Sequence, residues 1–130
     1  MSNMRVVFAL IAGTLCLGAP ISAHHNTATV YDVSKEKEVA FTGTVTKVEW
    51  ANPHIHIYVD VKEANGRVKN YAIEGGTPNS LYRRGWRKDS VKPGDMVKVA
   101  GAAPSRNGMP RVHLGSITTI EGRQLFSGRD

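Results

Sequence analysis

Cysteine is nearly absent from this sequence: the 130 residues include one, Cys16, which lies in the apolar N-terminal segment. Residues 24–130 therefore form no disulfide, no thiolate metal site and no redox dithiol, and they contain no cysteine nucleophile. Other catalytic signatures are also missing, including Gly-x-Ser-x-Gly, Gly-x-Gly-x-x-Gly and the Walker phosphate loop. We therefore expect a protein that is not an enzyme of these classes.

Long apolar runs are missing except near the N-terminus, where residues 6–17 (VVFALIAGTLCL) are mostly apolar. Arg5 precedes this run and Ile21-Ser22-Ala23 follows it, which is the order of a secretory signal peptide. The run is shorter than the roughly 20 apolar residues of a membrane-spanning helix. We expect residues 1–23 to be a signal peptide cleaved after Ala23, leaving no membrane span. An uncleaved anchor is the alternative.

Acidic residues are the minority, with 11 Asp and Glu against 17 Lys and Arg and a net charge of +6, which loss of Arg5 lowers to +5. The remaining residues, 24–130, are enough for one domain that folds without disulfides. Residues 24–38 are polar and predict an exposed N-terminal arm, with a short edge strand around residues 29–33. We expect a single domain over residues 39–126 and a tail over residues 127–130.

Period-two alternation of apolar residues predicts β-structure from residue 39 onward. In residues 39–50 the apolar phase slips by one near Gly43, which indicates a bulge or a sharp bend. The alternation is cleanest over residues 53–61. There the predicted buried residues are Ile55, Ile57, Val59 and Val61, and the residues predicted on the opposite face are His54, His56, Tyr58 and Asp60.

Turn signals divide the rest of the chain into further elements. Asn65-Gly66 is typical of a two-residue hairpin. Thr77 followed by Pro78 predicts the start of a short helix that ends near Gly85. Strands are expected over residues 96–100 and 111–120. The order of three strands, a helix and two strands favours an all-β fold with one short helix, an OB-like five-stranded barrel. A small β-sandwich is the alternative.

Histidines are the main candidates for chemistry. Cleavage after Ala23 would make His24 the terminal residue, whose amine and imidazole together chelate a metal ion; His25 adds a second imidazole. His54 and His56 are two apart on a strand, so both leave the same face and could converge on one ion. His113 alternates with Val112 and Leu114, so it is expected to point outward as a further ligand. Nitrogen ligands favour copper, with zinc as the alternative; structural histidines without metal are the other interpretation.

A second candidate site is a basic cluster after the predicted helix, which would attract an anionic partner. Its members are Arg83, Arg84, Arg87 and Lys88. Trp50, Tyr82 and Trp86 could stack bases, but an exported protein rarely meets nucleic acid, so an anionic glycan or a protein is preferred. A solvated helix end is the alternative, and we expect Trp50 and Trp86 to pack at the barrel mouth. The carboxylates Glu49, Asp60 and Glu74 are possible acids or bases, but the sequence pairs none of them.

Several short motifs together resemble one family. They are Ala23-His24-His25, Trp50-Ala51-Asn52-Pro53-His54 and Gly85-Trp86, together with Phe41-Thr42-Gly43-Thr44-Val45, Pro78-Asn79-Ser80-Leu81 and Lys92-Pro93-Gly94-Asp95. The chain is similar to a family of small exported bacterial proteins of unknown function. This resemblance implies a periplasmic location but no activity. Family members often continue His-His-Ser-Phe, whereas here Asn26-Thr27 follows.

Three functions are consistent with these features. The first is a periplasmic copper-binding protein that buffers or delivers the metal through His24, His54 and His56. The second is a metal-free OB-like adaptor in the cell envelope that binds an anionic glycan or a protein. Copper-dependent oxidation is the third, and it requires an open coordination position and a platform for substrate.

Overall fold

The computed structural model describes residues 26–127, which form seven strands and three short helices. The strands are β1 (Val39–Glu49), β2 (His56–Lys62), β3 (Val68–Glu74), β4 (Met96–Pro104), β5 (Arg111–His113), β6 (Ser116–Thr119) and β7 (Gln124–Ser127). The helices are α1 (Thr27–Val30), the 3₁₀ helix η1 (Lys35–Lys37) and α2 (Pro78–Arg83). No helix in this part of the chain is long and apolar enough to cross a membrane.

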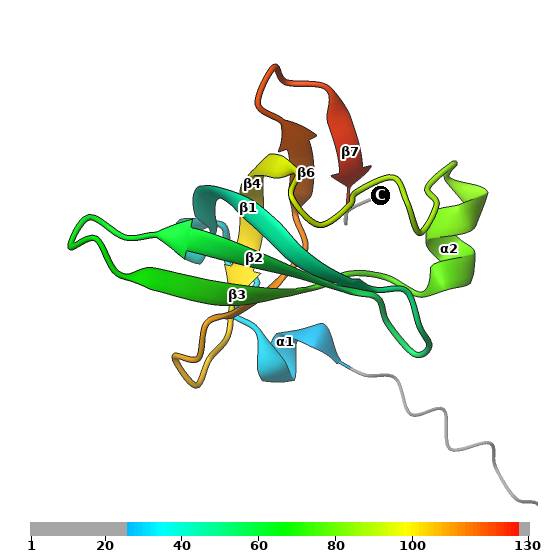
Figure 1. The fold of residues 1–130 in the computed structure, drawn as a ribbon. Coiled ribbons are helices and arrows are strands. Elements are labelled where there is room, and N and C mark those ends of the chain that lie inside the picture. Colours follow the sequence, from blue (N-terminus) through cyan, green and yellow to red (C-terminus); the bar gives the residue numbers. More distant parts are fainter. Residues whose placement is uncertain (1–25, 128–130) are drawn as a thin grey trace, which may run out of the picture.

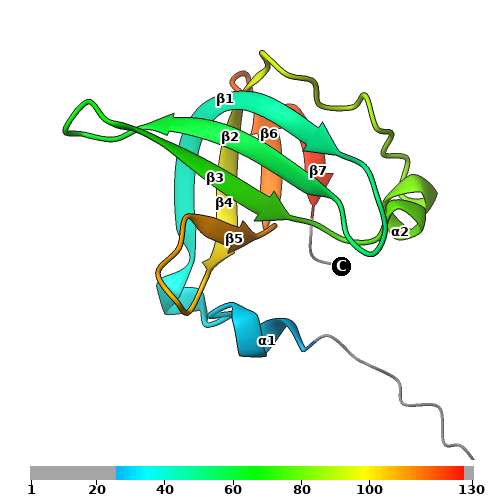
Figure 2. The ribbon, with the colours of Figure 1, turned by 60° about the horizontal axis from the view of Figure 1, so that its bottom comes forward.

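The first five strands close into a barrel. β1 pairs with β2 and β4, β2 pairs with β3, and β5 joins β4 to β3, the β3–β5 pair being parallel. This closure, with α2 between β3 and β4, is the OB-like arrangement expected from the element order and excludes an open sandwich. β6 and β7 extend the sheet beyond β4 (Figures 1 and 2).

The strand predicted over residues 111–120 is two strands, which corrects that expectation. Gly115 divides β5 from β6 because its backbone passes against β4: a Cβ atom there would lie 2.2 Å from the carbonyl oxygen of Ala100. β5 and β6 therefore pair with successive parts of β4. Residues 124–127 were not predicted as a strand, yet they form β7 and bring Phe126 into the core.

The long strand β1 bends as expected. Its register against β2 shifts between Val45 and Lys47, which is an irregularity at Thr46. Gly43 permits close contact at the bend, because a Cβ atom there would lie 2.4 Å from the carbonyl oxygen of Asp60. β1 can therefore pair with β2 at one end and with β4 at the other (Figure 2).

The barrel interior is apolar, and the alternation of apolar and polar residues over residues 55–61 determines which side chains of β2 point into it. Ile55, Ile57 and Val59 are fully buried, and Val61 is half-buried against the same core. Leu81 from α2 packs into this core, and α2 lies at one end of the barrel (Figure 1). His56 and Tyr58 occupy the alternate positions of β2, so the polar side chains of this strand lie on the outer surface of the barrel.

Both predicted local motifs are present, but the hairpin loop has three residues rather than the two expected, because the Glu63 N–H donates to the Arg67 carbonyl oxygen at 2.8 Å. Gly66 has a φ of +82° at the β2–β3 turn, where a left-handed residue is needed. The hydroxyl of Thr77 accepts a hydrogen bond from the Ser80 N–H at 3.2 Å, and Pro78 is the first residue of α2. Both motifs depend on neighbouring residues only, which is why the sequence was sufficient to locate them.

The short edge strand predicted around residues 29–33 is wrong, apart from one β-bridge between Tyr31 and Ser105. Residues 27–30 form α1, because the Asn26 side chain accepts a hydrogen bond from the Ala28 N–H and caps the turn. Tyr31 follows this helix and is 2% exposed. The described part of the arm is therefore packed against the barrel beside β5 and the β4–β5 loop (Figure 2).

Candidate functional site

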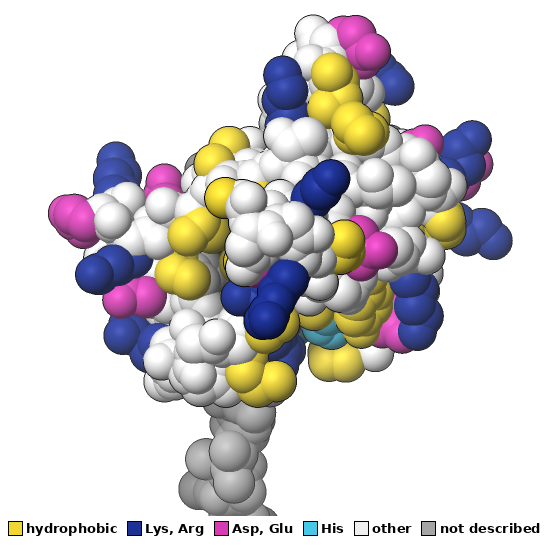
Figure 3. Space-filling model, turned by 60° about the vertical axis from the view of Figure 1, so that its left-hand side comes forward, with side chains coloured by type: hydrophobic (Ala, Val, Ile, Leu, Met, Phe, Trp, Pro, Cys, Tyr) yellow, Lys and Arg dark blue, Asp and Glu magenta, His cyan; other side chains and the backbone are white. Residues whose placement is uncertain are grey.

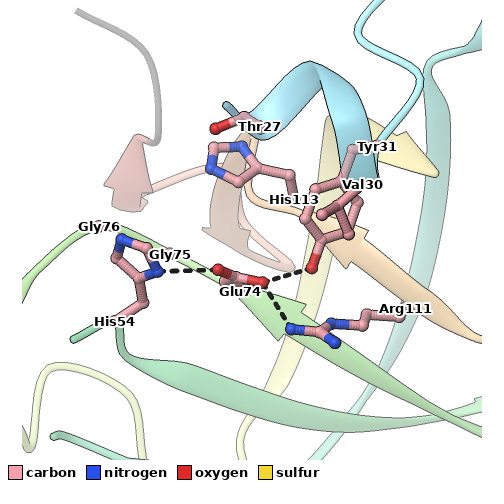
Figure 4. A pocket seen from close by; sticks show the side chains of 9 residues that line it. All are labelled: Thr27, Val30, Tyr31, His54, Glu74, Gly75, Gly76, Arg111 and His113. Atoms are coloured by element: carbon pink, nitrogen blue, oxygen red, sulfur yellow. Dashed lines mark hydrogen bonds and ion pairs between the residues drawn. The ribbon is translucent and has the colours of Figure 1, made fainter. Parts of the chain in front are cut away.

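Glu74, the last residue of β3, is the centre of a polar cluster (Figure 4). Its Oε2 accepts hydrogen bonds from the Tyr31 hydroxyl at 2.5 Å and from Nη2 of Arg111 at 2.7 Å. Its Oε1 lies 2.8 Å from Nδ1 of His54. The Glu74 side chain is only 13% exposed. A carboxylate held by three donors in a partly buried position is a fixed anion.

The barrel topology brings these groups together from distant parts of the sequence. Glu74 lies opposite His56 of β2 and, through the parallel pairing, opposite His113 of β5. His54 is fixed just before β2, where Ile55 exchanges two backbone hydrogen bonds of 3.0 Å with residues 75 and 76. Gly75 is needed there, because a Cβ atom would lie 2.8 Å from the Ile55 side chain.

Tyr31 closes the cluster from the N-terminal side. Its backbone bridges to Ser105, and Arg106 binds the preceding turn through the carbonyl oxygens of Ala28 and Val30. The Tyr31 ring packs against the His113 ring with centroids 5.5 Å apart. α1 is therefore held over β5 by both backbone and side-chain contacts.

A pocket of about 280 Å³ opens beside Glu74, and we call it the Glu74 pocket. It lies between α1, the end of β3 and β5 (Figure 4). Its lining residues are Thr27, Val30, Tyr31, His54, Glu74, Gly75, Gly76, Arg111 and His113. The polar groups of this wall thus include one carboxylate, one guanidinium, one phenol and two imidazoles.

The electrostatics of the pocket keep Glu74 ionised. Burial by itself raises the pKa of Glu74, but the hydrogen bonds from Tyr31 and Arg111, the charge of Arg111 and the bond with His54 outweigh it, so the pKa lies below its usual value. Burial and the bond to Glu74 raise the pKa of Tyr31 above its usual value. Tyr31 therefore stays a neutral donor and Glu74 an anion near neutral pH.

The predicted metal ligands are only partly brought together. His54 and His113 both line the Glu74 pocket. His56 does not line it; it lies opposite Glu49 and Glu74 in the strand register, with its ring 6.4 Å from that of Tyr58. His24 and His25 lie outside the described residues. Within residues 26–127, no three His, Cys, Asp or Glu side chains form a group that could hold a metal ion.

Sequence reasoning missed three residues of this site. Glu74 was considered but left unpaired, and neither Tyr31 nor Arg111 was singled out. The one available signal was Tyr31, the single aromatic residue of a mostly polar arm. The other two possible acids have separate partners: Glu49 accepts a hydrogen bond from the Tyr58 hydroxyl at 3.1 Å, and Asp60 accepts one from Asn70 at 2.8 Å.

The predicted basic cluster lies around the end of α2. Arg87 is ordered there: its Nη1 donates to the carbonyl oxygens of Tyr82 and Trp86, and its guanidinium lies 3.8 Å from the centroid of the Tyr82 ring. Nη1 of Arg84 donates to the carbonyl oxygen of Ser127 at 3.2 Å. On the face drawn in Figure 3, by contrast, basic side chains are spread out with acidic ones among them.

Trp50 and Trp86 pack at this end of the barrel, as predicted. Trp86 stacks on Phe126 with ring centroids 4.8 Å apart, and Trp50 lies 6.4 Å from the same ring. Trp50 also lines a second cavity of about 490 Å³ together with Tyr82, Arg87, Lys88 and Asp89. We call it the Tyr82 cavity. The β1–β2 loop contributes to both hollows, since Trp50 lines one and His54 the other.

Comparison with protein families identifies the family of this chain. Residues 12–113 match a family described as a family of unknown function, DUF6152. No curated protein matches the chain, and no solved structure does. Because the match covers well over half of the sequence, the chain belongs to this family of unknown function.

Proposed function

We propose that this protein is a small exported, periplasmic binding protein that holds a copper ion at the Glu74 pocket and buffers or delivers it. The observation that carries this proposal is the position of Thr27 on the pocket wall beside His54 and His113. His24 precedes Thr27 by three residues, and three extended residues span up to about 10 Å. The chelating terminus that follows cleavage after Ala23 is therefore within reach of both imidazoles.

The contact between His54 and Glu74 supports a ligand role for this histidine. Metal-binding histidines commonly donate their second ring N–H to a carboxylate, which fixes the tautomer and the ring orientation. Glu74 is an ionised acceptor 2.8 Å from Nδ1 of His54, so the favoured tautomer has its proton on Nδ1 and its lone pair on Nε2. In this proposal Nε2 is the ligand atom and Glu74 a positioning residue.

The ligand set combines the described residues with the terminus. His54 and His113 supply two imidazoles from the pocket wall, and His24 supplies an amine and a third imidazole. These nitrogen donors suit Cu(II), with Zn(II) as the weaker competitor. His25 follows His24 in the sequence, and His56 lies opposite Glu74 in the sheet. In this proposal both are additional ligands that contribute less than His24, His54 and His113.

Copper titration against a competing chelator tests the proposal. The parent begins at His24, and a matched variant has one additional serine before His24, which removes the terminal amine chelate. We expect this extension, His54→Gln and His113→Gln each to weaken copper binding about tenfold or more, and His56→Gln to have a smaller effect. Circular dichroism verifies that each variant is folded. Parent-like affinity in the extended protein and in both pocket variants would show that these groups share no site.

A further inference from the structure

The Tyr82 cavity combines aromatic surface with cations that have unused donors. Nη1 of Arg87 donates both of its hydrogens to carbonyl oxygens, so the guanidinium is fixed against the Tyr82 ring. A guanidinium has five N–H donors, and the other three of Arg87 have no hydrogen-bond partner within residues 26–127. They form an ordered fork of the kind that recognises carboxylate oxygens.

The charges around this cavity are strongly unbalanced. Arg87 and Lys88 line it with one carboxylate, Asp89, and the exposed Arg83 and Arg84 precede them in the chain. The Glu74 pocket is different, because its guanidinium is already paired with a carboxylate. The Tyr82 cavity therefore favours an anionic ligand, independently of any metal at the other site.

The aromatic residues determine which anion fits. Tyr82 is 59% exposed although it is a large hydrophobic residue, and Trp50 lines the same hollow. Exposed aromatic rings beside cations offer a flat apolar surface to one part of a ligand and a charge to another. A pyranose ring with a carboxylate substituent has both parts.

A saccharide also fits the position of the cavity better than a peptide strand does. Peptide addition to a sheet needs an unpaired strand edge, whereas the residues lining this cavity lie in the β1–β2 loop, α2 and the turn after it. The loop between the first two strands is one that OB-folds use to bind oligosaccharides. The cavity volume of about 490 Å³ lies in the ordinary range for small ligands.

We propose that the Tyr82 cavity is a binding site for an acidic saccharide, in which Trp50 and Tyr82 contact the apolar face of a sugar ring and Arg87 and Lys88 bind its carboxylate. The site is separate from the Glu74 pocket and shares no lining residue with it, so either one can be wrong without the other.

The probe is trigalacturonic acid, titrated into the protein while the two tryptophan indole N–H signals are followed by NMR. The methyl ester of the same trisaccharide is the uncharged control, and hexaglutamate is the acidic peptide. We expect the trisaccharide acid to shift the Trp50 signal, its ester to bind at least about fivefold more weakly, and hexaglutamate not to shift Trp50. Binding of the acid should weaken as sodium chloride is raised, because exposed charges are screened.

Matched variants distinguish binding at the Tyr82 cavity from non-specific attraction between the basic protein and an anionic ligand. Tyr82→Ala should weaken binding about tenfold and Tyr82→Phe less than about twofold, because the phenylalanine keeps the ring. Lys88→Gln should weaken it about threefold, as expected for one exposed ion pair. Arg67→Gln removes the same charge from the β2–β3 turn, away from α2 in Figure 1, and should have no effect.

Three results would overturn the proposal. Equal losses in Lys88→Gln and Arg67→Gln would show non-specific charge attraction. Equal binding of acid and ester would show that the cations are not used. Tighter binding of hexaglutamate, with the same dependence on Tyr82 and Lys88, would assign the cavity to an acidic peptide.

Discussion

The Glu74 pocket and the Tyr82 cavity both contain an arginine and a tyrosine, but the two pairs are used differently. Arg111 and Tyr31 both donate to one carboxylate that is 13% exposed. Arg87 and Tyr82 share a surface where no carboxylate of residues 26–127 is bonded to either, and Tyr82 is 59% exposed. The first arrangement fixes geometry, because each group limits the others; the second leaves charge and ring surface open to a ligand.

Different consequences for stability follow from this comparison. Partly buried charges that are paired make removal of one partner expensive, because the remaining groups lose their counter-charge. Exposed cations remain hydrated and contribute little to folding. Variants at the two sites should therefore separate into a group that alters folding and a group that alters ligand binding alone.

The largest effect is expected for Glu74→Ala. It removes the acceptor of Tyr31, His54 and Arg111 at once and should lower the free energy of unfolding by about 3 kcal/mol. Urea unfolding followed by tryptophan fluorescence measures this change. Lys88→Ala in the Tyr82 cavity is the matched control and should leave the urea midpoint unchanged. Equal midpoints for both variants would remove the distinction between the two sites.

Acid should reduce the contribution that the Glu74 pocket makes to the free energy of unfolding. Folding lowers the pKa of Glu74, so the stabilisation from its ionised form is complete above the ordinary glutamate pKa of about 4.3 and is lost as the pH falls through the lower, folded-state pKa. We expect the free energy of unfolding to fall between about pH 5 and pH 3, and less steeply in Glu74→Gln. Urea titrations at several pH values measure both slopes, and identical slopes would contradict this assignment.

A smaller change is expected for Tyr31→Phe, which keeps the buried ring and removes only the hydroxyl bonded to Glu74. A hydrogen bond to a charged acceptor is worth about 1.5–3 kcal/mol, and we expect the low end because Arg111 and His54 still hold the carboxylate. Hydrogen exchange locates the effect: the Tyr31 amide, which donates to Thr27, should exchange faster in this variant than the amides of β2. Uniformly faster exchange would show that α1 is not a separate unit.

The sequence predicted those parts of the fold that depend on local pattern. Alternation over residues 53–61 predicted the buried face of β2, and Thr77-Pro78 predicted α2. The site was harder to predict because Glu74 and His113 meet through a parallel strand pair, and no periodicity in either segment indicates that pairing. The edge strand predicted around residues 29–33 was wrong for a related reason: a segment this short has too few residues for periodicity to distinguish a strand from a turn of helix.

The histidines proposed as metal ligands show the same limit of sequence-based prediction. The spacing of His54 and His56 correctly indicated that both lie on the outer side of β2, but it did not indicate which neighbouring strand supplies another imidazole. The pocket lining adds His113, which the sequence indicated as outward-facing without a partner. The proposed copper titration compares His113→Gln with His56→Gln and so tests which of the two histidines belongs to the proposed site.

A smaller effect on stability is expected for Arg87→Gln than for Arg111→Gln. Both variants remove a guanidinium that lies against a tyrosine ring. The bonds of Arg87 reach surface carbonyl oxygens that water can satisfy, so its loss should cost less than about 1 kcal/mol. Loss of Arg111 leaves the ionised Glu74 without its cation and should cost more, about 1.5 kcal/mol. Urea midpoints measured side by side give the difference, and a larger loss in Arg87→Gln would show that the loop around the Tyr82 cavity, rather than the Glu74 pocket, is the better-fixed region.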